Sequence, residues 1–273
     1  MRRNIVLVYF SLLLVTNNVH SLDIKADRDG PSDAEYVLMS GRIVPGDAER
    51  LAAFIVDYGK RTDSLARAFR IQSEGGDVAE AIKIGSLIKG LFGTIKVQGN
   101  KVCASSCFLV WMNGAFRMAG AKDFPSDAGF LAVHRPYFSD DKGRGVNAEM
   151  HGTRQVNAMK SMRSYLEENL VPRSLIDEML SRPSNDAYLL TGKEIRMLGE
   201  IPPWFEEISI ARCGYRRNLV DEIVSAGSRG NTAEAQRLRD LDDKIIGCQH
   251  SIGSEAGRTF FMKLYAGGRP WKK

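Results

Sequence analysis

Short apolar runs alternate with longer amphipathic stretches over the larger part of the chain. Four of the runs are typical of buried strands, at 36–39, 66–72, 94–97 and 129–133. Helical spacing of apolar residues follows Asp47, a candidate N-cap, and recurs from Val78 to Leu91. The run 108–112 is apolar on all sides, which predicts a buried helix. Strands that alternate with helices in this order predict an α/β fold with a largely parallel sheet.

The rest of the chain has a mainly helical pattern. We expect helices over 146–170 and 173–180 and another after Thr191. Beyond them, two apolar stripes joined by 227–231 predict a helical hairpin, with Thr232 as the N-cap of its second helix. The pattern divides the chain into a polar lead, one α/β domain, and a C-terminal helical hairpin with its tail, at 22–35, 36–205 and 206–273.

The first residues have the order of a secretory signal. Arg2 and Arg3 precede an apolar run at 5–15, and small or modest residues at 19–21 stand where a cleavage site is expected. The apolar run has 11 residues, fewer than the ~20 that span a bilayer as a helix. We therefore expect a signal peptide at 1–21, cleavage after Ser21, and a periplasmic or extracellular protein with no stable membrane span.

The charge pattern changes this picture little. The formal net charge is +5, and Arg2 and Arg3 of the signal supply two of those charges. The remaining Lys and Arg residues are scattered along the chain, which is typical of a mildly basic, solvated surface. We expect no nucleic-acid partner.

The four cysteines are disulfide candidates if the protein is exported to an oxidising compartment. Cys103 and Cys107 are four positions apart, so their side chains are neighbours if the segment is helical. The alternative is two small buried thiols. Cys213 and Cys248 lie at the two ends of the predicted hairpin, and a bond between them is the pairing we favour. No cysteine or histidine pairs have zinc-finger spacing, and we expect no metal and no cofactor.

Three segments that follow predicted strands carry candidate chemistry, namely Gly75-Gly76, 103–107 and His134. The carboxyl ends of parallel strands meet at one edge of a sheet, so these segments are expected to converge there. Ser105 stands where a loop enters the buried helix, which leaves the backbone N–H of the following Ser106 available to a developing oxyanion. The glycine pair can supply a second such donor, because glycine lets the backbone approach a substrate closely.

These residues resemble the motifs of a known peptidase family. Ser73-Glu74-Gly75-Gly76, 104–109 (Ala-Ser-Ser-Cys-Phe-Leu) and 132–136 (Ala-Val-His-Arg-Pro) are similar, in order and spacing, to three core motifs of the Clp protease proteolytic subunit. The resemblance covers about 36–201 and is greatest to exported Clp-protease-like proteins of the wider superfamily that contains the crotonases. It implies stacked ββα units and a serine peptidase that binds its substrate as an extended strand.

The resemblance also implies roles for single residues. Ser105, rather than Ser106, matches the nucleophile, and His134 matches the base. Gly76 and Ser106 match the two oxyanion-hole positions. The third member of the triad is expected shortly before Leu190-Thr191, and Asp186 is the candidate, although it lies one residue further upstream than the family pattern. Glu74 and Cys107 also depart from the family, which usually has proline and glycine there.

The sequence leaves three functions open. The first is an ATP-independent serine peptidase that cleaves peptides or unfolded chains, because the chain has no phosphate-binding loop. The second is a catalytically impaired fold that serves as a peptide-binding or scaffold protein. The third is a Ser-Lys dyad with Lys160 as the base. The family forms stacked rings, so a homo-oligomer is possible, and the helical hairpin could block or replace that assembly.

Overall fold

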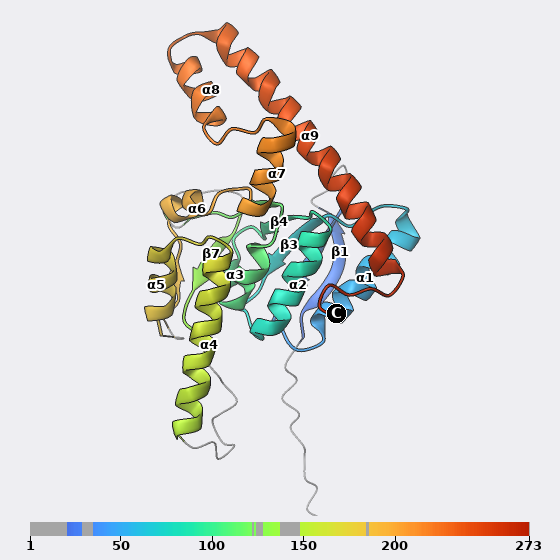
Figure 1. Cartoon of the computed structure of the whole chain (residues 1–273), viewed down its shortest axis with the longest axis vertical. Helices are drawn as coiled ribbons and strands as arrows, with labels where there is room; N and C mark the ends of the chain where they lie inside the picture. The colour runs from blue at the N-terminus through green and yellow to red at the C-terminus, as the bar shows by residue number, and fades with distance from the viewer. Residues whose placement is uncertain are drawn as a thin grey trace, which may run out of the picture.

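The structure is a computed structural model that describes residues 21–28, 35–121, 123, 128–136, 148–183 and 186–272. Its main sheet has the strand order β1-β2-β3-β4-β6. The strands are β1 (Asp23–Arg28), β2 (Glu35–Ser40), β3 (Ala68–Gln72), β4 (Thr94–Val97) and β6 (Phe116–Met118). The pairs from β2 to β6 are parallel, and β1 runs antiparallel to β2 at the edge. The prediction of a largely parallel α/β fold is therefore confirmed (Figure 1).

A second, smaller sheet continues from the carboxyl ends of the first. It contains β5 (Val102–Ala104), β7 (Phe130–Val133) and β8 (Tyr188–Leu189) in that spatial order. The β5–β7 pair is parallel and the β7–β8 pair is antiparallel. A single bridge between Ser73 and Cys103 connects β5 to the chain just beyond β3. Strands of three residues are too short to show a clear alternation in sequence, so β5 and β6 were not predicted.

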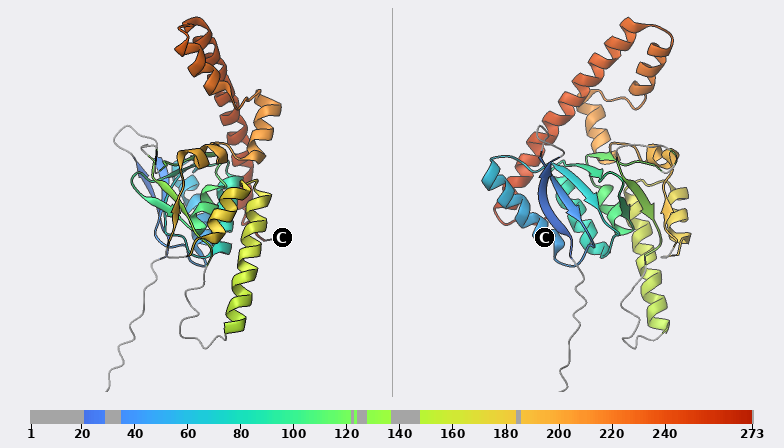
Figure 2. Two further views of the ribbon diagram at one scale, coloured as in Figure 1. Left: turned by 90° about the vertical axis from the view of Figure 1, so that its left-hand side faces the viewer. Right: turned by 180° about the vertical axis from the view of Figure 1, so that it is seen from behind.

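The described helices pack mainly around the five-stranded sheet. They are α1 (Asp47–Thr62), α2 (Val78–Gly90), α3 (Ser106–Trp111), α4 (Ala148–Glu168), α5 (Arg173–Ser181), α6 (Gly192–Leu198), α7 (Pro203–Cys213), α8 (Leu219–Ser228) and α9 (Thr232–Tyr265). Figures 1 and 2 show α2, α4 and α9 on one side of the sheet. The helix α3 is buried along its whole length, as its all-apolar pattern predicts.

The main core joins these elements through buried aliphatic and aromatic side chains from both sheets and from α1 to α6. Charged side chains are buried beside it, among them Asp47, Glu80 and Arg117. Arg117 on β6 is 2% exposed and donates from Nη2 to the carbonyls of Leu198 and Gly199 and from Nη1 to that of Met112. Burial lowers the pKa of Arg117 to about 10, so the guanidinium remains charged at neutral pH and binds the carboxyl ends of α3 and α6.

Two predicted helix caps are wrong by one residue. Asp47 is the first residue of α1 rather than its N-cap, which is Gly46 with a φ of 99°. The Asp47 carboxylate instead accepts hydrogen bonds from the backbone N–H groups of Val44 and Leu22. At α9 the N-cap is Asn231, whose side chain accepts from Glu234 N–H, and Thr232 begins the helix.

The predicted domain boundaries do not coincide with the boundaries of helices and strands. The segment predicted as a polar lead contains β1, an edge strand with exposed positions. Because exposed edge positions are occupied by charged residues, the sequence pattern did not predict this strand. The expected boundary between 205 and 206 falls inside α7, so the division into domains stays a prediction. The predicted signal peptide lies outside the described residues except for Ser21. Within the described part, no helix combines the length and the apolar character needed to cross a bilayer.

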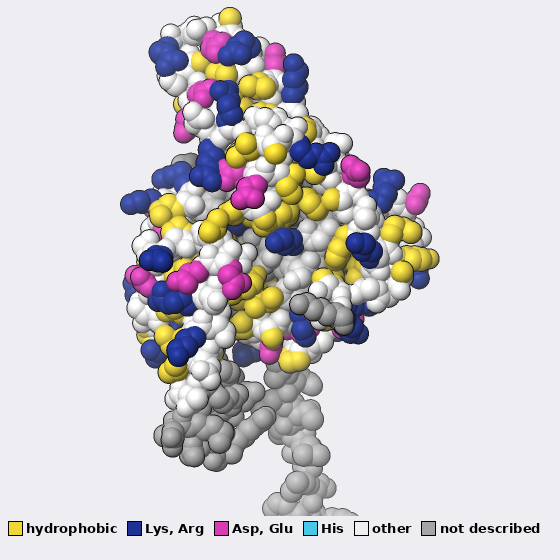
Figure 3. Space-filling view, in the orientation of Figure 1, with side chains coloured by type: hydrophobic (Ala, Val, Ile, Leu, Met, Phe, Trp, Pro, Cys, Tyr) yellow, Lys and Arg dark blue, Asp and Glu magenta, His cyan; other side chains and the backbone are white. Residues whose placement is uncertain are grey.

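The C-terminal hairpin of α8 and α9 extends beyond the body of the molecule (Figures 1 and 2). Its own small core is built on Leu219, Leu238 and Ile245, and Cys213 is paired with Cys248 near its base. The remainder of α9 runs back over the body, where Phe260 packs against Gly90 and Phe261 against Gly59. On the face shown in Figure 3, basic and acidic side chains are interspersed, in keeping with the scattered charges of the sequence.

Candidate active site

Ser105 occupies the turn that connects β5 to α3. Its backbone has φ 57° and ψ −127°, a combination that residues with a side chain rarely adopt. The turn is held on both sides, because Ser105 N–H donates to the Ala132 carbonyl on β7 at 3.0 Å and Phe108 N–H donates to the Ser105 carbonyl at 3.0 Å. Strained turns between a strand and a helix present the nucleophile in other serine hydrolases, so this outlier marks Ser105 as a candidate.

The glycine pair after β3 lies against this turn. A Cβ atom on Gly75 would lie 2.7 Å from both the Ala104 carbonyl oxygen and Ser105 Cβ, so only glycine fits there. A Cβ atom on Gly76 would lie 2.0 Å from the Ile43 carbonyl oxygen. Ile43 N–H donates to the Gly75 carbonyl, and Asp77 N–H donates to the Ile43 carbonyl. These two bonds fix the path of the glycine backbone beside Ser105.

Two backbone donors remain available at this point. Among the described residues, no acceptor is bound to the N–H of Gly76 or to the N–H of Ser106. The Ser106 side chain is fully buried and its hydroxyl has no hydrogen-bond partner, which separates it from the half-buried Ser105. Only the backbone of Ser106, and not its hydroxyl, is therefore available to a substrate oxyanion.

His134 follows β7 directly and is brought to the same region by strand pairing. Ala104 on β5 pairs with Ala132 on β7, so the residues that follow the two strands, Ser105 and His134, leave the sheet at the same end. The imidazole is 5% exposed, and its Nδ1 lies 2.8 Å from the carbonyl oxygen of Arg135. A carbonyl can only accept, so Nδ1 carries a proton, and in a neutral imidazole of this tautomer Nε2 is the basic nitrogen. That tautomer can act as a base.

Asp186 lies close to His134 in strand register but is bound elsewhere. Tyr188 on β8 pairs with Val133, the residue before His134. The Asp186 carboxylate is exposed and forms an ion pair with Arg182, with 3.0 Å between Oδ2 and Nη1. The structure thus places the three predicted catalytic residues on adjoining segments without joining Asp186 to the imidazole ring by a hydrogen bond among the described contacts.

The two carbonyl groups that hold Ser105 and His134 were not predicted. They belong to Ala132 and Arg135, and each is a backbone group that every residue possesses, so the sequence contains no signal for them. The described contacts include no hydrogen bond between Ser105 Oγ and the His134 ring. Lys160, the alternative base, is exposed on α4, and no described hydrogen bond or ion pair links it to Ser105.

Cys103 and Cys107 are paired on either side of Ser105. Both are fully buried, one in β5 and the other in the first turn of α3. The cross-link therefore closes the segment whose central residue has the strained backbone. Together with the pair at 213 and 248, it gives the chain two disulfides and leaves no free cysteine among the described residues.

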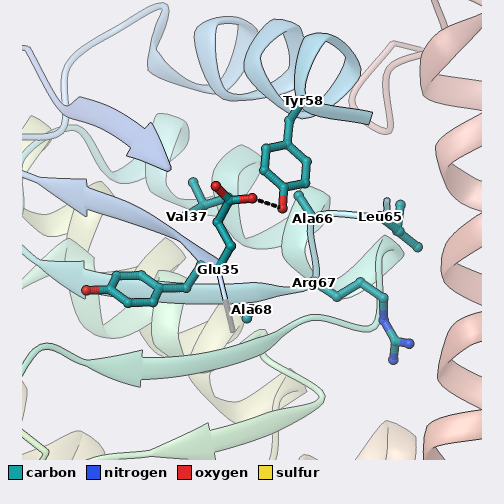
Figure 4. Close-up of a pocket in the computed structure, with 8 residues that line it drawn as sticks. Glu35, Val37, Tyr58, Leu65, Ala66, Arg67 and Ala68 are labelled. Carbon is teal, nitrogen blue, oxygen red and sulfur yellow. Dashed lines mark hydrogen bonds between the residues drawn. The ribbon is translucent and has the colours of Figure 1, made fainter. Parts of the chain in front are cut away.

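A separate hollow of about 290 Å³ lies at the opposite, amino-terminal end of β2 and β3. Figure 4 shows Tyr58 from α1 and Glu35 from β2 pointing toward one another across it, joined by a hydrogen bond of 2.5 Å. Arg67, which also lines the hollow, donates to Ser254 Oγ and to the Phe92 carbonyl. Because the two ends of a strand face opposite edges of the sheet, this hollow is no part of the region around Ser105.

Comparisons with known proteins give distant likenesses. No protein-family model matches the chain, and no curated protein matches it. Among solved structures, ClpP1 from Listeria monocytogenes is similar with a TM-score of 0.41, and a mutant of the same protein with a TM-score of 0.42. Each has 17% sequence identity, and the match covers 60% of this chain and 86% of the other. The interpretation of the site rests on the geometry of the chain itself.

Proposed function

We propose that the protein is an exported serine hydrolase that cleaves peptides or unfolded chains without ATP. The observation that carries this proposal is the backbone of Ser105, which is held in a sparsely populated conformation by Ala132 of β7. Such conformations cost roughly 1–3 kcal/mol and persist where the surrounding structure imposes them. A buried histidine in the base-competent tautomer follows the same strand β7, which supports the assignment.

The proposed reaction proceeds through an acyl-enzyme. Ser105 Oγ attacks the peptide carbonyl while its proton passes to His134 Nε2. The negative charge on the carbonyl oxygen is stabilised by the N–H groups of Gly76 and Ser106, each worth about 3 kcal/mol in comparable enzymes. The imidazolium then returns the proton to the leaving amine, and water releases the acyl group by the same route in reverse.

Substrate binding has a part in this scheme. Catalytic hydrogen bonds are often long in a free enzyme and tighten when substrate binds. We expect the Ser105 and His134 side chains to approach to ~2.6–3.2 Å in the acylated or substrate-bound state. Orientation of His134 comes from the Arg135 carbonyl in the structure. Asp186 takes that role only if its carboxylate turns from Arg182 to Nδ1.

A fluorophosphonate probe tests the nucleophile directly. We expect the wild-type protein to be labelled and the Ser105→Ala variant to be unlabelled. The Ser106→Ala variant should retain labelling, because it removes a buried, unpartnered hydroxyl and keeps the backbone N–H. Peptide mapping of the labelled protein locates the adduct. Equal labelling of wild type and Ser105→Ala would refute the assignment of Ser105.

One observation favours the alternative of a peptide-binding or scaffold protein. The Asp186 carboxylate is held by Arg182, which in turn also binds Glu178 at 2.6 Å. An aspartate bound to an arginine in this way does not orient the base, and loss of the aspartate from a serine-protease triad lowers its rate greatly. An unlabelled, folded wild-type protein that binds an extended peptide, measured by calorimetry, would support this alternative over the hydrolase.

A further inference from the structure

The chain enters the described fold through a fully buried residue. The Leu22 side chain is 0% exposed and belongs to the main core, which fixes the position of its backbone. Its N–H donates to Asp47 Oδ2 at 3.3 Å, and its carbonyl accepts from Arg50 Nη2 at 2.6 Å. Ser21, one residue earlier, is exposed. The peptide bond between Ser21 and Leu22 therefore marks the boundary between exposed chain and core.

The Asp47 carboxylate that receives Leu22 is itself buried, at 0% exposure. Its Oδ1 is bound by the half-exposed Arg50 at 2.6 Å. Among the described contacts, its Oδ2 is bound by uncharged donors, the N–H groups of Val44 at 2.8 Å and of Leu22. A positive charge on one of these donors adds direct Coulomb attraction to the hydrogen bond that the carboxylate already accepts.

From this geometry we propose that Leu22 is the first residue of the mature protein and that its α-ammonium forms an ion pair with Asp47. Two independent observations meet at the same bond: the order of residues 1–21 predicts cleavage after Ser21, and the buried carboxylate faces the nitrogen of residue 22. Cleavage elsewhere would leave the new ammonium away from Asp47.

The step is an ordinary hydrolysis by a signal-peptidase-type endopeptidase. The C–N bond between Ser21 and Leu22 breaks, the hydroxyl of a water molecule adds to the Ser21 carbonyl carbon, and a hydrogen passes to the Leu22 nitrogen. The free amine takes up a further proton, since α-amino groups titrate near ~8 and are mostly protonated at neutral pH. Processing thus converts a neutral donor at Asp47 into a cation.

The ion pair has a route to the candidate active site. Asp47 Oδ2 also holds Val44 N–H, and the preceding Ile43 is bonded to Gly75 and Asp77 on both sides of Gly76. The pair therefore strengthens the segment against which the predicted oxyanion-hole glycine lies. The proposal itself is independent of the hydrolase, because processing and stability can be measured without catalysis.

The first test is the N-terminal sequence of the exported protein, which we expect to begin at Leu22. The second compares two purified chains, one beginning at Leu22 and one beginning at Ser21, each released from a fusion by a protease that leaves no extra residue. We expect the Leu22 chain to unfold at a temperature several degrees higher. In Asp47→Asn the difference between the two chains should disappear, because the anionic partner is gone.

Glu49→Gln is the matched control, since Glu49 is another carboxylate in the first turn of α1 and pairs with Arg269 and Lys272 instead. In this variant the difference between the two chains should persist. The proposal is overturned if the mature protein begins at another residue, or if Ser21 makes no difference in the wild type. If Asp47→Asn does not fold, the rate at which cyanate carbamylates the Leu22 amine of the wild type is measured instead. We expect carbamylation to be slower in the folded protein than in the chain unfolded in urea. Equal rates would overturn the ion pair.

Discussion

At the scale of single residues, Ser105 and Ser106 are the same residue type but differ in burial, backbone conformation and the environment of the hydroxyl group. Ser105 is half-buried and has a strained backbone, whereas Ser106 is fully buried with an unpartnered hydroxyl. The His134 Nδ1 lies 2.8 Å from the carbonyl oxygen of Arg135, which orients the ring. Each property comes from the immediate surroundings of one side chain, and together they distinguish Ser105 from the serine that follows it.

The part played by Asp186 can be measured at this scale. We expect Asp186→Asn to lower the rate of fluorophosphonate labelling by less than about tenfold, because the Arg135 carbonyl keeps the Nδ1 proton in place. Loss of the aspartate from a serine-protease triad, by contrast, lowers kcat by about 10⁴-fold. Asp177→Asn, which removes another exposed carboxylate paired with an arginine, is the control and should label at the wild-type rate. A loss approaching the larger figure would identify Asp186 as the third catalytic residue.

At the scale of elements, the two disulfides have different tasks. The pair at 103 and 107 joins β5 to the start of α3 across the Ser105 turn, with three residues between the cysteines. The pair at 213 and 248 joins α7 to α9 near the base of the hairpin, 35 positions apart. The first therefore constrains the candidate site, while the second constrains the hairpin.

These tasks predict that the two disulfides contribute differently to labelling and to stability. Replacing both Cys103 and Cys107 by alanine removes the cross-link that closes a short loop, which is worth about 2 kcal/mol of unfolding free energy in the chain-entropy account. We expect this variant to be labelled at least about tenfold more slowly than the wild type, because the Ser105 turn relaxes. Replacing both Cys213 and Cys248 removes a longer loop, worth up to about 4 kcal/mol, and should leave the labelling rate near that of the wild type. Denaturant titration and probe kinetics of the two double variants decide the matter. A larger decrease of the labelling rate in the variant without Cys213 and Cys248 would contradict the assigned tasks.

At the scale of the whole molecule, α9 is both part of the hairpin and part of the body. Its first half packs on α8, and its second half covers α1 and α2 through Phe260, Phe261 and Leu264. Gly59 and Gly90 leave room for two of these rings. A Cβ atom on Gly59 would lie 2.5 Å from the Phe261 ring, and a Cβ atom on Gly90 would lie 2.4 Å from the Phe260 ring. The hairpin is thus fixed to the body by the same helix that builds it.

This arrangement predicts where α9 contributes to stability. Phe261→Ala should lower the free energy of unfolding by about 2 kcal/mol, less than the loss for a fully buried phenylalanine because the ring is partly exposed. The neighbouring Met262 is 58% exposed, so Met262→Ala should change the free energy of unfolding by less than about 0.5 kcal/mol. Chemical denaturation of both variants measures the difference. Similar values for the two would show that the end of α9 is not anchored on α1.

Several elements were predictable from the pattern of apolar residues along the chain. The strands at 36–39 and 94–97, the helix after Asp47 and the buried helix at 108–112 were predictable, because the burial of apolar faces dictates both their pattern and their packing. Thr191 was recognisable before its helix, and it does cap α6 with a reciprocal bond to Glu194. The same logic placed Gly75-Gly76 after β3 and His134 after β7, whereas Ser105 follows β5, a strand that was not predicted, and β5 and β7 form the smaller sheet rather than the sheet of β3.

The contacts that make the site specific could not be predicted from the sequence. Short strands such as β5, the carbonyls of Ala132 and Arg135, and the ion pair of Asp186 with Arg182 depend on segments that meet through space. The burial of Leu22 against Asp47 is of the same kind, since nothing near residue 22 in the chain announces a carboxylate 25 positions later. Every residue carries a backbone carbonyl, so residue types do not indicate which carbonyl will accept a hydrogen bond. Partners that are far apart in the chain become neighbours only when the chain folds.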